Sequence, residues 1–259
     1  AVLQARAHGV DGKVVAGASI EERSVVARGK LASELPRDAT NAVTPATIKA
    51  ALERFAAEQG HPARIAAQPP GSVPDTLLRY WLKKQLGFAD PAKAASIVGV
   101  GIDAAQQAFL AGAVDAVVLR EPALTVVEAK VPDLRVLATG HDMMPDQPGS
   151  VLALVKPDAA DHQAWARTLT ALFVRATTLL AQHPDEAVPY VQTALGGGML
   201  DDAVLKKALE RSAASFISDP SRIVAGVTAL QDFEVELGLL RKAEPVSDLF
   251  NQTLWRPTP

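Results

Sequence analysis

PPGSVPDTLLRYWLKKQLG (residues 69–87) joins a short apolar strand to an amphipathic helix, and this junction decides the expected fold. The strand RIAA (64–67) comes directly before it. After Ser72, apolar residues recur at helical spacing: Leu77, Leu78, Trp81 and Leu82. Ser72 and Asp75 have the spacing of a capping box, and Gly87 stops the pattern. The stretch therefore predicts a strand, a turn at Gly71 and a helix over residues 72–86.

This turn is also the first candidate site. Helix N-termini carry unsatisfied N–H groups and the positive end of the helix dipole, and in open α/β sheets ligands bind above the carboxyl ends of the strands. An anionic group could be held by the Ser72 hydroxyl and by the first backbone N–H groups, around Gly71 and Val73. The alternative is that Ser72 only caps its own helix, and the residues favour the two readings about equally.

Strand and helix patterns alternate through the first 155 residues. The expected strands are 13–16, 64–67, 96–98, 114–119, 134–138 and 151–155. The expected helices between them are 44–58, 72–86, 103–111 (with a variant capping box at Asp103 and Gln106) and 122–130. After Val155 the chain reads as almost wholly helical, over 159–182, 184–195, 200–215 and 220–237. The order β-α-β-α-β predicts an α/β fold with a parallel, doubly wound sheet.

A second glycine turn offers an enzymatic alternative. GVGIDA (99–104) matches the pattern G-x-G-x-x-A after a strand, and Glu121 follows at about the distance of a ribose-binding acid. Asp103 would repel a pyrophosphate, however, and the pattern lies in the middle of the chain. We therefore favour an ordinary glycine turn here and expect no affinity for NAD or NADP.

The third candidate is VDAVVLREP (114–122). Arg120 and Glu121 come at the carboxyl end of an apolar strand, so at least one of the two side chains is expected to face a ligand cleft. The alternative is a structural ion pair without a ligand role.

Composition excludes several classes of function. The 259 residues carry a net charge of −3 and 5% aromatics, which gives no basis for binding nucleic acid. There is no cysteine, the five histidines are scattered, and we expect neither a metal nor a cofactor. No serine nucleophile motif occurs, and apolar runs end well short of the roughly 18 residues that a membrane span needs.

On the helix expected over residues 159–182, a stripe of large apolar side chains is expected to form core rather than a cofactor site. It consists of Trp165, Leu169, Leu172, Phe173 and Leu179.

Four stretches together resemble the nitrate, sulfonate and taurine group of ABC-transporter substrate-binding proteins. They are PPGSVPDTLLRYWLKKQLG (69–87), AAQQAFLAGAVDAVVLREP (104–122), PGSVLALVKP (148–157) and FISDPSRIVAGVTALQDFEVELGLL (216–240), the last followed by DLF (248–250). The resemblance implies the type II periplasmic-binding-protein fold, in which two α/β lobes close on a ligand. It also implies ligand contacts at Gly71 and Ser72, a position for Glu121 near the cleft, and a contact from the other lobe at Ser19, just after the first strand.

The domain organisation follows from the same resemblance. Residues 1–43 and 151–259 are expected to form one lobe, and residues 44–150 the other. The family begins with a strand, a helix and a strand, and the opening AVLQARAHGVDGKVV reads as a helix end, a turn and a strand. We therefore expect a preceding segment of about 30 residues or more, with an export signal. The helix over 45–58 stands where the family has a short connection.

The resulting prediction is a monomeric, extracytoplasmic solute-binding protein of an ABC importer. It would be periplasmic or lipid-anchored, would pass a small, anionic ligand to a membrane permease, and would catalyse nothing. Two alternatives remain: an enzyme of the same fold, as in pyrimidine or menaquinone synthesis, or a dinucleotide-binding enzyme that uses Gly99 and Gly101. A desulfinase mechanism is excluded because it needs a cysteine.

Overall fold

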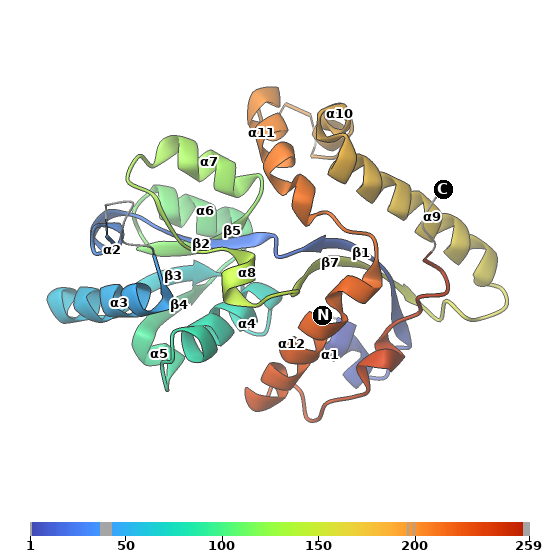
Figure 1. The fold of residues 1–259 in the computed structure, drawn as a ribbon, viewed down its shortest axis with the longest axis horizontal. Helices are drawn as coiled ribbons and strands as arrows, with labels where there is room; N and C mark the ends of the chain where they lie inside the picture. The colour runs from blue at the N-terminus through green and yellow to red at the C-terminus, as the bar shows by residue number, and fades with distance from the viewer. Residues whose placement is uncertain (1, 37–42, 196, 199, 256–259) are drawn as a thin grey trace. The chain divides into compact units, whose positions relative to one another are not determined.

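The computed structural model describes residues 2–36, 43–195, 197–198 and 200–255, and the chain forms two compact units (Figure 1). Unit 1 consists of Ala1–Glu22 and Pro145–Pro259, and unit 2 of Arg23–Met144. These units divide the chain after Glu22 and Met144, whereas the lobes expected from the resemblance divide it after residues 43 and 150. The segment from Arg23 belongs to unit 2 because its strand pairs in that sheet; residues 37–42 lie outside the described part.

Unit 2 alternates strands and helices. Its strands are β2 (Arg23–Ala27), β3 (Ala63–Ala67), β4 (Ala95–Gly99), β5 (Ala116–Arg120) and β6 (Arg135–Ala138). Its helices are α2 (Gly29–Ser33), α3 (Pro45–Gln59), α4 (Val73–Tyr80), α5 (Pro91–Ala94), α6 (Ile102–Leu110), α7 (Ala123–Lys130) and α8 (Gly140–Met143). Figure 1 shows α6 and α7 on one face of the sheet and α3 and α4 on the other.

The sheet of unit 2 has the strand order β4-β3-β5-β2-β6. β3 is parallel to β4 and β5, whereas β2 is antiparallel to both of its neighbours, β5 and β6. The sheet of unit 2 is thus rich in parallel strands, as expected, and β2 is the strand that runs against the others. β2 enters directly from unit 1, only two residues after β1, and a strand that is not preceded by a crossover helix is free to run the other way.

Local signals explain the main helices of unit 2. Thr44 caps α3 in a reciprocal box with Thr47, Pro45 is its first residue, and Gly60 ends it with φ of 73°. The apolar face of α4 is buried as expected, although the helix continues as a π-helical segment over Trp81–Gln85. The capping box expected at Asp103 and Gln106 is absent, because α6 begins at Ile102 with Gly101 as an N-cap that has no side chain.

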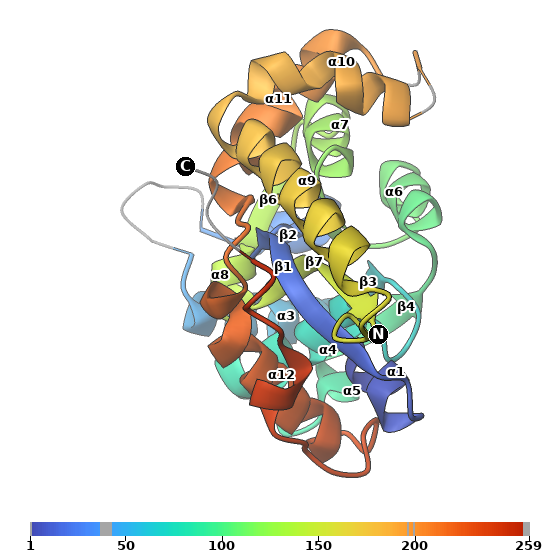
Figure 2. The same ribbon diagram turned by 90° about the vertical axis from the view of Figure 1, so that its right-hand side faces the viewer.

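Unit 1 is built on one antiparallel strand pair. β1 (Gly12–Ile20) pairs with β7 (Pro148–Val155), so that Lys13 lies opposite Leu154. The helices are α1 (Val2–Ala7), α9 (Gln163–Gln182), α10 (Pro184–Ala194), α11 (Asp202–Ser212) and α12 (Val224–Glu236), with 3₁₀ turns at Ala213–Ser215, Pro220–Ile223 and Val246–Leu249. Figure 2 shows α10 and α11 side by side, where Ala187, Leu205 and Leu209 are buried together.

The face that α9 turns to the core differs from the expected one. Its buried residues are small or β-branched: Ala166, Thr170, Val174 and Thr177. Trp165, Leu169 and Leu172, which were expected in the core, are 42%, 41% and 55% exposed. Helical spacing identified a stripe of large apolar residues correctly, but it did not identify the side of the helix that packs.

Candidate functional site

One edge of the sheet in unit 2 collects most of the predicted site residues. β3, β4, β5 and β6 all end at this edge, and β2 begins there because it runs in the opposite direction. We call it the carboxyl edge. It brings together the 69–72 turn after β3, the Gly101 turn after β4, and the pair Arg120 and Glu121 at the end of β5. Ligands of open α/β sheets bind at such an edge.

The turn after β3 has the geometry that its sequence predicts. The Ser72 N–H donates to the Pro69 carbonyl (3.0 Å), and Gly71 has φ of 80°. Pro70 followed by a glycine of positive φ fits a type II turn. Ser72 then caps α4, since its Oγ accepts from the Asp75 N–H at 3.4 Å. The capping role is thus observed, while the ligand role of Gly71, Ser72 and Val73 stays a prediction.

Asp75 makes different contacts from those expected of a capping box. It is 1% exposed, and its Oδ2 accepts from the Gly71 N–H (3.1 Å) rather than from the Ser72 N–H. Both of its carboxylate oxygens also accept from Nε of Arg79 at 3.0 Å, one helical turn later. The carboxylate therefore locks the turn onto the helix, and its charge is balanced by a guanidinium.

These contacts define the donors that remain for a ligand at the start of α4. Pro74 has no N–H, and the Asp75 N–H is directed to Ser72 Oγ. The Val73 N–H has no acceptor among the described residues. The Ser72 hydroxyl can still donate its hydrogen while its oxygen accepts from Asp75. An anion would thus find one backbone donor and one hydroxyl here.

Two arginines lie opposite each other at the same edge. Arg23 begins β2 and Arg120 ends β5, and they are direct partners in the antiparallel register. Side chains of directly paired residues project from the same face of a sheet. Arg23 is 8% exposed and Arg120 is half-buried. The edge therefore carries two guanidinium groups on neighbouring strands.

Glu121 has a structural role of its own. Its Oε2 accepts from the Thr125 N–H at 2.9 Å, in the first turn of α7. A carboxylate is favourable at a helix N-terminus, because it satisfies an unpaired donor and complements the dipole. The side chain thus caps α7, which lessens its availability for a ligand.

The GVGIDA turn has a packing explanation. A Cβ on Gly99 would lie 3.0 Å from Cδ of Pro70 and 3.3 Å from Cα of Pro69, and the Val100 N–H donates to the Ala67 carbonyl (2.8 Å). Gly99 therefore allows the two turns of the carboxyl edge to approach each other closely. This contact favours a structural role for Gly99 over one in a dinucleotide site.

Ser19 belongs to unit 1 and lies within β1, rather than after it. It is 3% exposed, its hydroxyl donates to Glu22 Oε2 (2.5 Å), and its Oγ accepts from the Ser150 N–H (3.0 Å). Nearby in unit 1, the Gln147 carbonyl accepts from the Glu21 N–H. The Gln147 side chain is fully buried, and neither of its polar atoms has a hydrogen-bond partner among the described residues.

Sequence reasoning missed Arg23, Arg79 and Gln147. For Arg79 the signal was present, as an aspartate and an arginine four residues apart on one helix. Arg23 precedes the apolar run SVVA, but its significance depends on pairing with a strand more than 90 residues away. No local pattern marks Gln147.

Other kinds of site find no support in the described part of the chain. Among those residues, no group of three or more histidine, aspartate or glutamate side chains could hold a metal ion. Within the same ranges, no helix is both long and apolar enough to cross a membrane.

Three of the solved structures that this chain resembles are binding proteins or binding components from bacteria. The ligand-binding component of an ABC-type import system from Staphylococcus aureus is 16% identical, with a TM-score of 0.71 over 98% of this chain and 76% of that one. The periplasmic aliphatic sulphonate-binding protein SsuA from Escherichia coli is 20% identical, with a TM-score of 0.69 over 98% and 72%. The periplasmic nitrate-binding protein NrtA from Synechocystis is 14% identical, with a TM-score of 0.71 over 95% and 66%.

Identities this low show a shared fold, here that of the type II periplasmic binding proteins, as the sequence predicted. No curated protein sequence matches the chain. The model of one protein family, described as NMT1-like, matches residues 3–195, which is well over half of the chain. The protein therefore belongs to the NMT1-like family.

Proposed function

We propose that the protein is the solute-binding component of an ABC importer, that it binds a small anion of the sulfonate or nitrate type, and that it catalyses no reaction. The observation that carries this proposal is the pairing of Arg23 with Arg120 at the carboxyl edge, the same edge at which α4 begins. A guanidinium group offers two parallel N–H donors, which match the oxygens of a small oxyanion. Because the two arginines are opposite each other in the register, one anion could accept hydrogen bonds from both of them.

The surroundings of the two arginines suit an anion. The Ser72 hydroxyl and the Val73 N–H at the same edge add two uncharged donors and the positive end of a helix dipole. Two carboxylates of unit 2 at this edge have partners of their own, since Asp75 pairs with Arg79 and Glu121 accepts from the Thr125 N–H.

The relatives support the same ligand class. Structures with this fold include an aliphatic sulphonate-binding protein, an alkanesulfonate-binding protein from Xanthomonas axonopodis and a nitrate-binding protein. Each of these ligands is a small oxyanion. We extend the proposal to a monomer that works outside the cytoplasm, in the periplasm or held by a lipid anchor, and that delivers its ligand to a membrane permease.

The test is calorimetric titration with nitrate, taurine and ethanesulfonate at low ionic strength. At least one anion is expected to bind. Arg120→Gln and Arg23→Gln should each lower its affinity by about ten- to a hundredfold, the range for a lost hydrogen bond to a charged group. Arg167→Gln on the exposed face of α9 makes the same change in net charge and should have little effect.

Two outcomes would overturn the proposal. If both arginine variants bind the anion as tightly as the unaltered protein, the site is elsewhere. If none of the anions binds while NAD or NADP binds with micromolar affinity, the dinucleotide-enzyme alternative replaces the transport function.

A further inference from the structure

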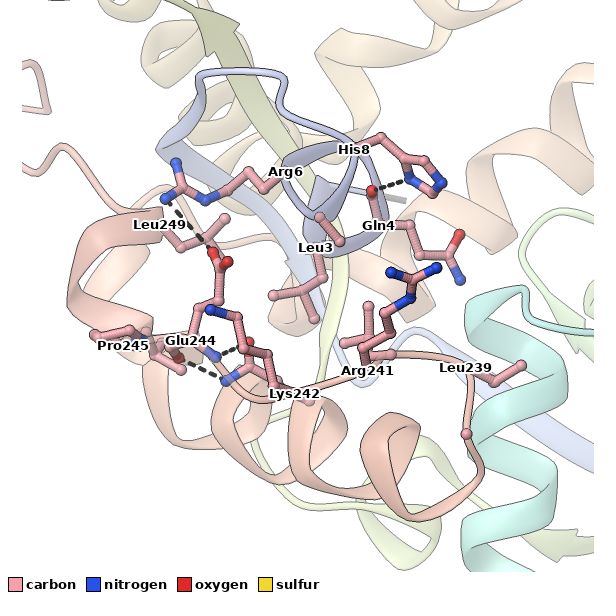
Figure 3. A pocket seen from close by; sticks show the side chains of 15 residues that line it. Leu3, Gln4, Arg6, His8, Leu239, Arg241, Lys242, Glu244, Pro245 and Leu249 are labelled. Carbon is pink, nitrogen blue, oxygen red and sulfur yellow. Dashed lines mark hydrogen bonds and ion pairs between the residues drawn. The ribbon is translucent and has the colours of Figure 1, made fainter.

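A cavity of about 550 Å³ lies within unit 1, between α1 and the segment that follows α12 (Figure 3). All of its lining residues belong to this one unit. Its volume falls within the range of about 300–1,000 Å³ that is typical of small-molecule sites. None of the residues predicted from the sequence to contact a ligand lines it.

Part of the cavity wall is formed by buried aliphatic side chains, and hydrogen bonds fix the loop at its rim. Leu240 and Leu249 are 6% and 3% exposed, and Leu3 of α1 adds a third aliphatic side chain. Nε2 of the buried Gln231 donates to the Glu244 carbonyl (2.8 Å), and the Glu244 N–H donates back to its Oε1 (3.3 Å). This two-way contact fixes the loop that forms the rim of the cavity.

Three basic side chains, Arg6, Arg241 and Lys242, line the cavity, and among the described residues only Arg6 has an acidic partner. Arg6 donates to the Gly12 carbonyl (3.1 Å) and lies 3.9 Å from the Glu244 carboxylate. Arg241 and Lys242 form no ion pair within the described part of the chain. In Figure 3 the guanidinium of Arg241 points toward Gln4 on α1. With Glu244 as the one acid of the lining, the cavity carries two uncompensated positive charges, in a protein whose net charge is −3.

We propose that this cavity is a second binding site, for a small organic acid with an apolar body, such as an alkyl carboxylate. The carboxylate would be held by Arg241 and Lys242 at the rim, and the hydrocarbon would cover Leu3, Leu240 and Leu249. A guanidinium offers paired donors to a carboxylate, and each methylene that leaves water adds about 0.8 kcal/mol. The proposal does not depend on the function proposed for the carboxyl edge, since the two sites share no residue.

The test is titration of the 259-residue protein with octanoate, with octanol as the uncharged counterpart. Octanoate is expected to bind and octanol to bind at least tenfold more weakly. The double variant Arg241→Gln/Lys242→Gln should lower octanoate affinity by tenfold or more, and added salt should weaken what remains. The matched control Arg167→Gln/Arg175→Gln removes the same charge from α9 and should leave octanoate affinity unchanged.

Three results would overturn the second site: no binding of octanoate at millimolar concentration, equal binding of octanol, or equal losses in the two double variants. Titration with nitrate or ethanesulfonate separates this outcome from the first proposal. Those anions should bind the Arg241→Gln/Lys242→Gln variant as they bind the unaltered protein, even if octanoate binding fails.

Discussion

Asp75 in unit 2 and Glu234 in unit 1 are both buried carboxylates, with 1% and 2% of their surface exposed, but they are accommodated in opposite ways. Asp75 accepts hydrogen bonds from the Gly71 N–H and from Arg79. Oε2 of Glu234 has no hydrogen-bond partner among the described residues, and burial raises the pKa of this carboxyl.

The difference shows what a buried charge contributes in each place. At the carboxyl edge both carboxylate oxygens of Asp75 accept hydrogen bonds, so the side chain holds the turn that positions Gly71 and Ser72. In α12, Oε2 of Glu234 is buried without a hydrogen-bond partner among the described residues, so the loss of hydration makes ionisation cost free energy. Burial alone therefore does not distinguish a group that organises a site from one that weakens the fold.

The largest effect at the Asp75 turn is expected from a second carboxylate, placed at position 72. Ser72→Asp should keep α4 capped, because aspartate is as good an N-cap as serine. It should lower affinity for the bound anion by at least a hundredfold, because it places a negative charge where the ligand's charge must lie. Calorimetry and thermal melting of the variant would measure both effects.

Ser72→Ala is the matched control for this experiment. It removes one neutral donor, so the loss of binding should be partial, about 1–3 kcal/mol, while stability falls by about 1 kcal/mol or less. If Ser72→Asp binds the anion as the unaltered protein does, the start of α4 is not the anion site.

The pairing of Asp75 can also be tested by neutralising it. Asp75→Asn should lower the free energy of unfolding by about 2 kcal/mol, since it breaks a buried ion pair whose arginine is partly exposed. Urea denaturation would measure the loss, and a double-mutant cycle with Arg79→Gln would isolate the coupling between the two side chains. A coupling energy near zero would mean that the turn does not depend on this pair.

At Glu234, neutralising the carboxylate is expected to raise the free energy of unfolding rather than to lower it. Because its folded pKa is raised, the protonated form is favoured on folding, and stability is lost as pH rises from the ordinary glutamate range through the raised pKa. Glu234→Gln should therefore increase stability by about 1 kcal/mol at neutral pH, or roughly 2–4 °C in Tm. The gain should vanish at acid pH, where both proteins are uncharged at this position. A gain that persists there would rule out ionisation as its cause.

Local signals were sufficient for much of this fold. The helix starts at Thr44 and Ser72 follow from capping residues and prolines that act within one helical turn. The direction and place of β2 could not be predicted, because they depend on pairing with β5 and β6, far along the chain. The orientation of α9 also escaped the sequence, since its buried side consists of small residues that give a weak apolar signal.

The residues of the candidate site also fall into two groups: those that a local sequence pattern marks and those that depend on distant pairing. Gly71 and Ser72 were predicted because a glycine turn and an N-cap leave a mark within four residues. The cap that Glu121 forms on α7 is equally local, yet a strand-end acid has the same appearance whether it binds a helix or a ligand. Arg23 gained its importance only from the strand register, which no local pattern records.

The strand pair of unit 1 also determines when this protein can finish folding. Lys13 pairs with Leu154, and the whole of unit 2 lies between them in the chain. During synthesis, β1 must therefore wait until all of unit 2 has emerged, whereas unit 2 needs no residue beyond Met144. Contacts so distant in sequence form slowly, and domains generally fold as units. The inserted unit can thus become compact first and bring the two halves of unit 1 together, so that β1, although it is made before unit 2, finds its partner strand after unit 2 is complete.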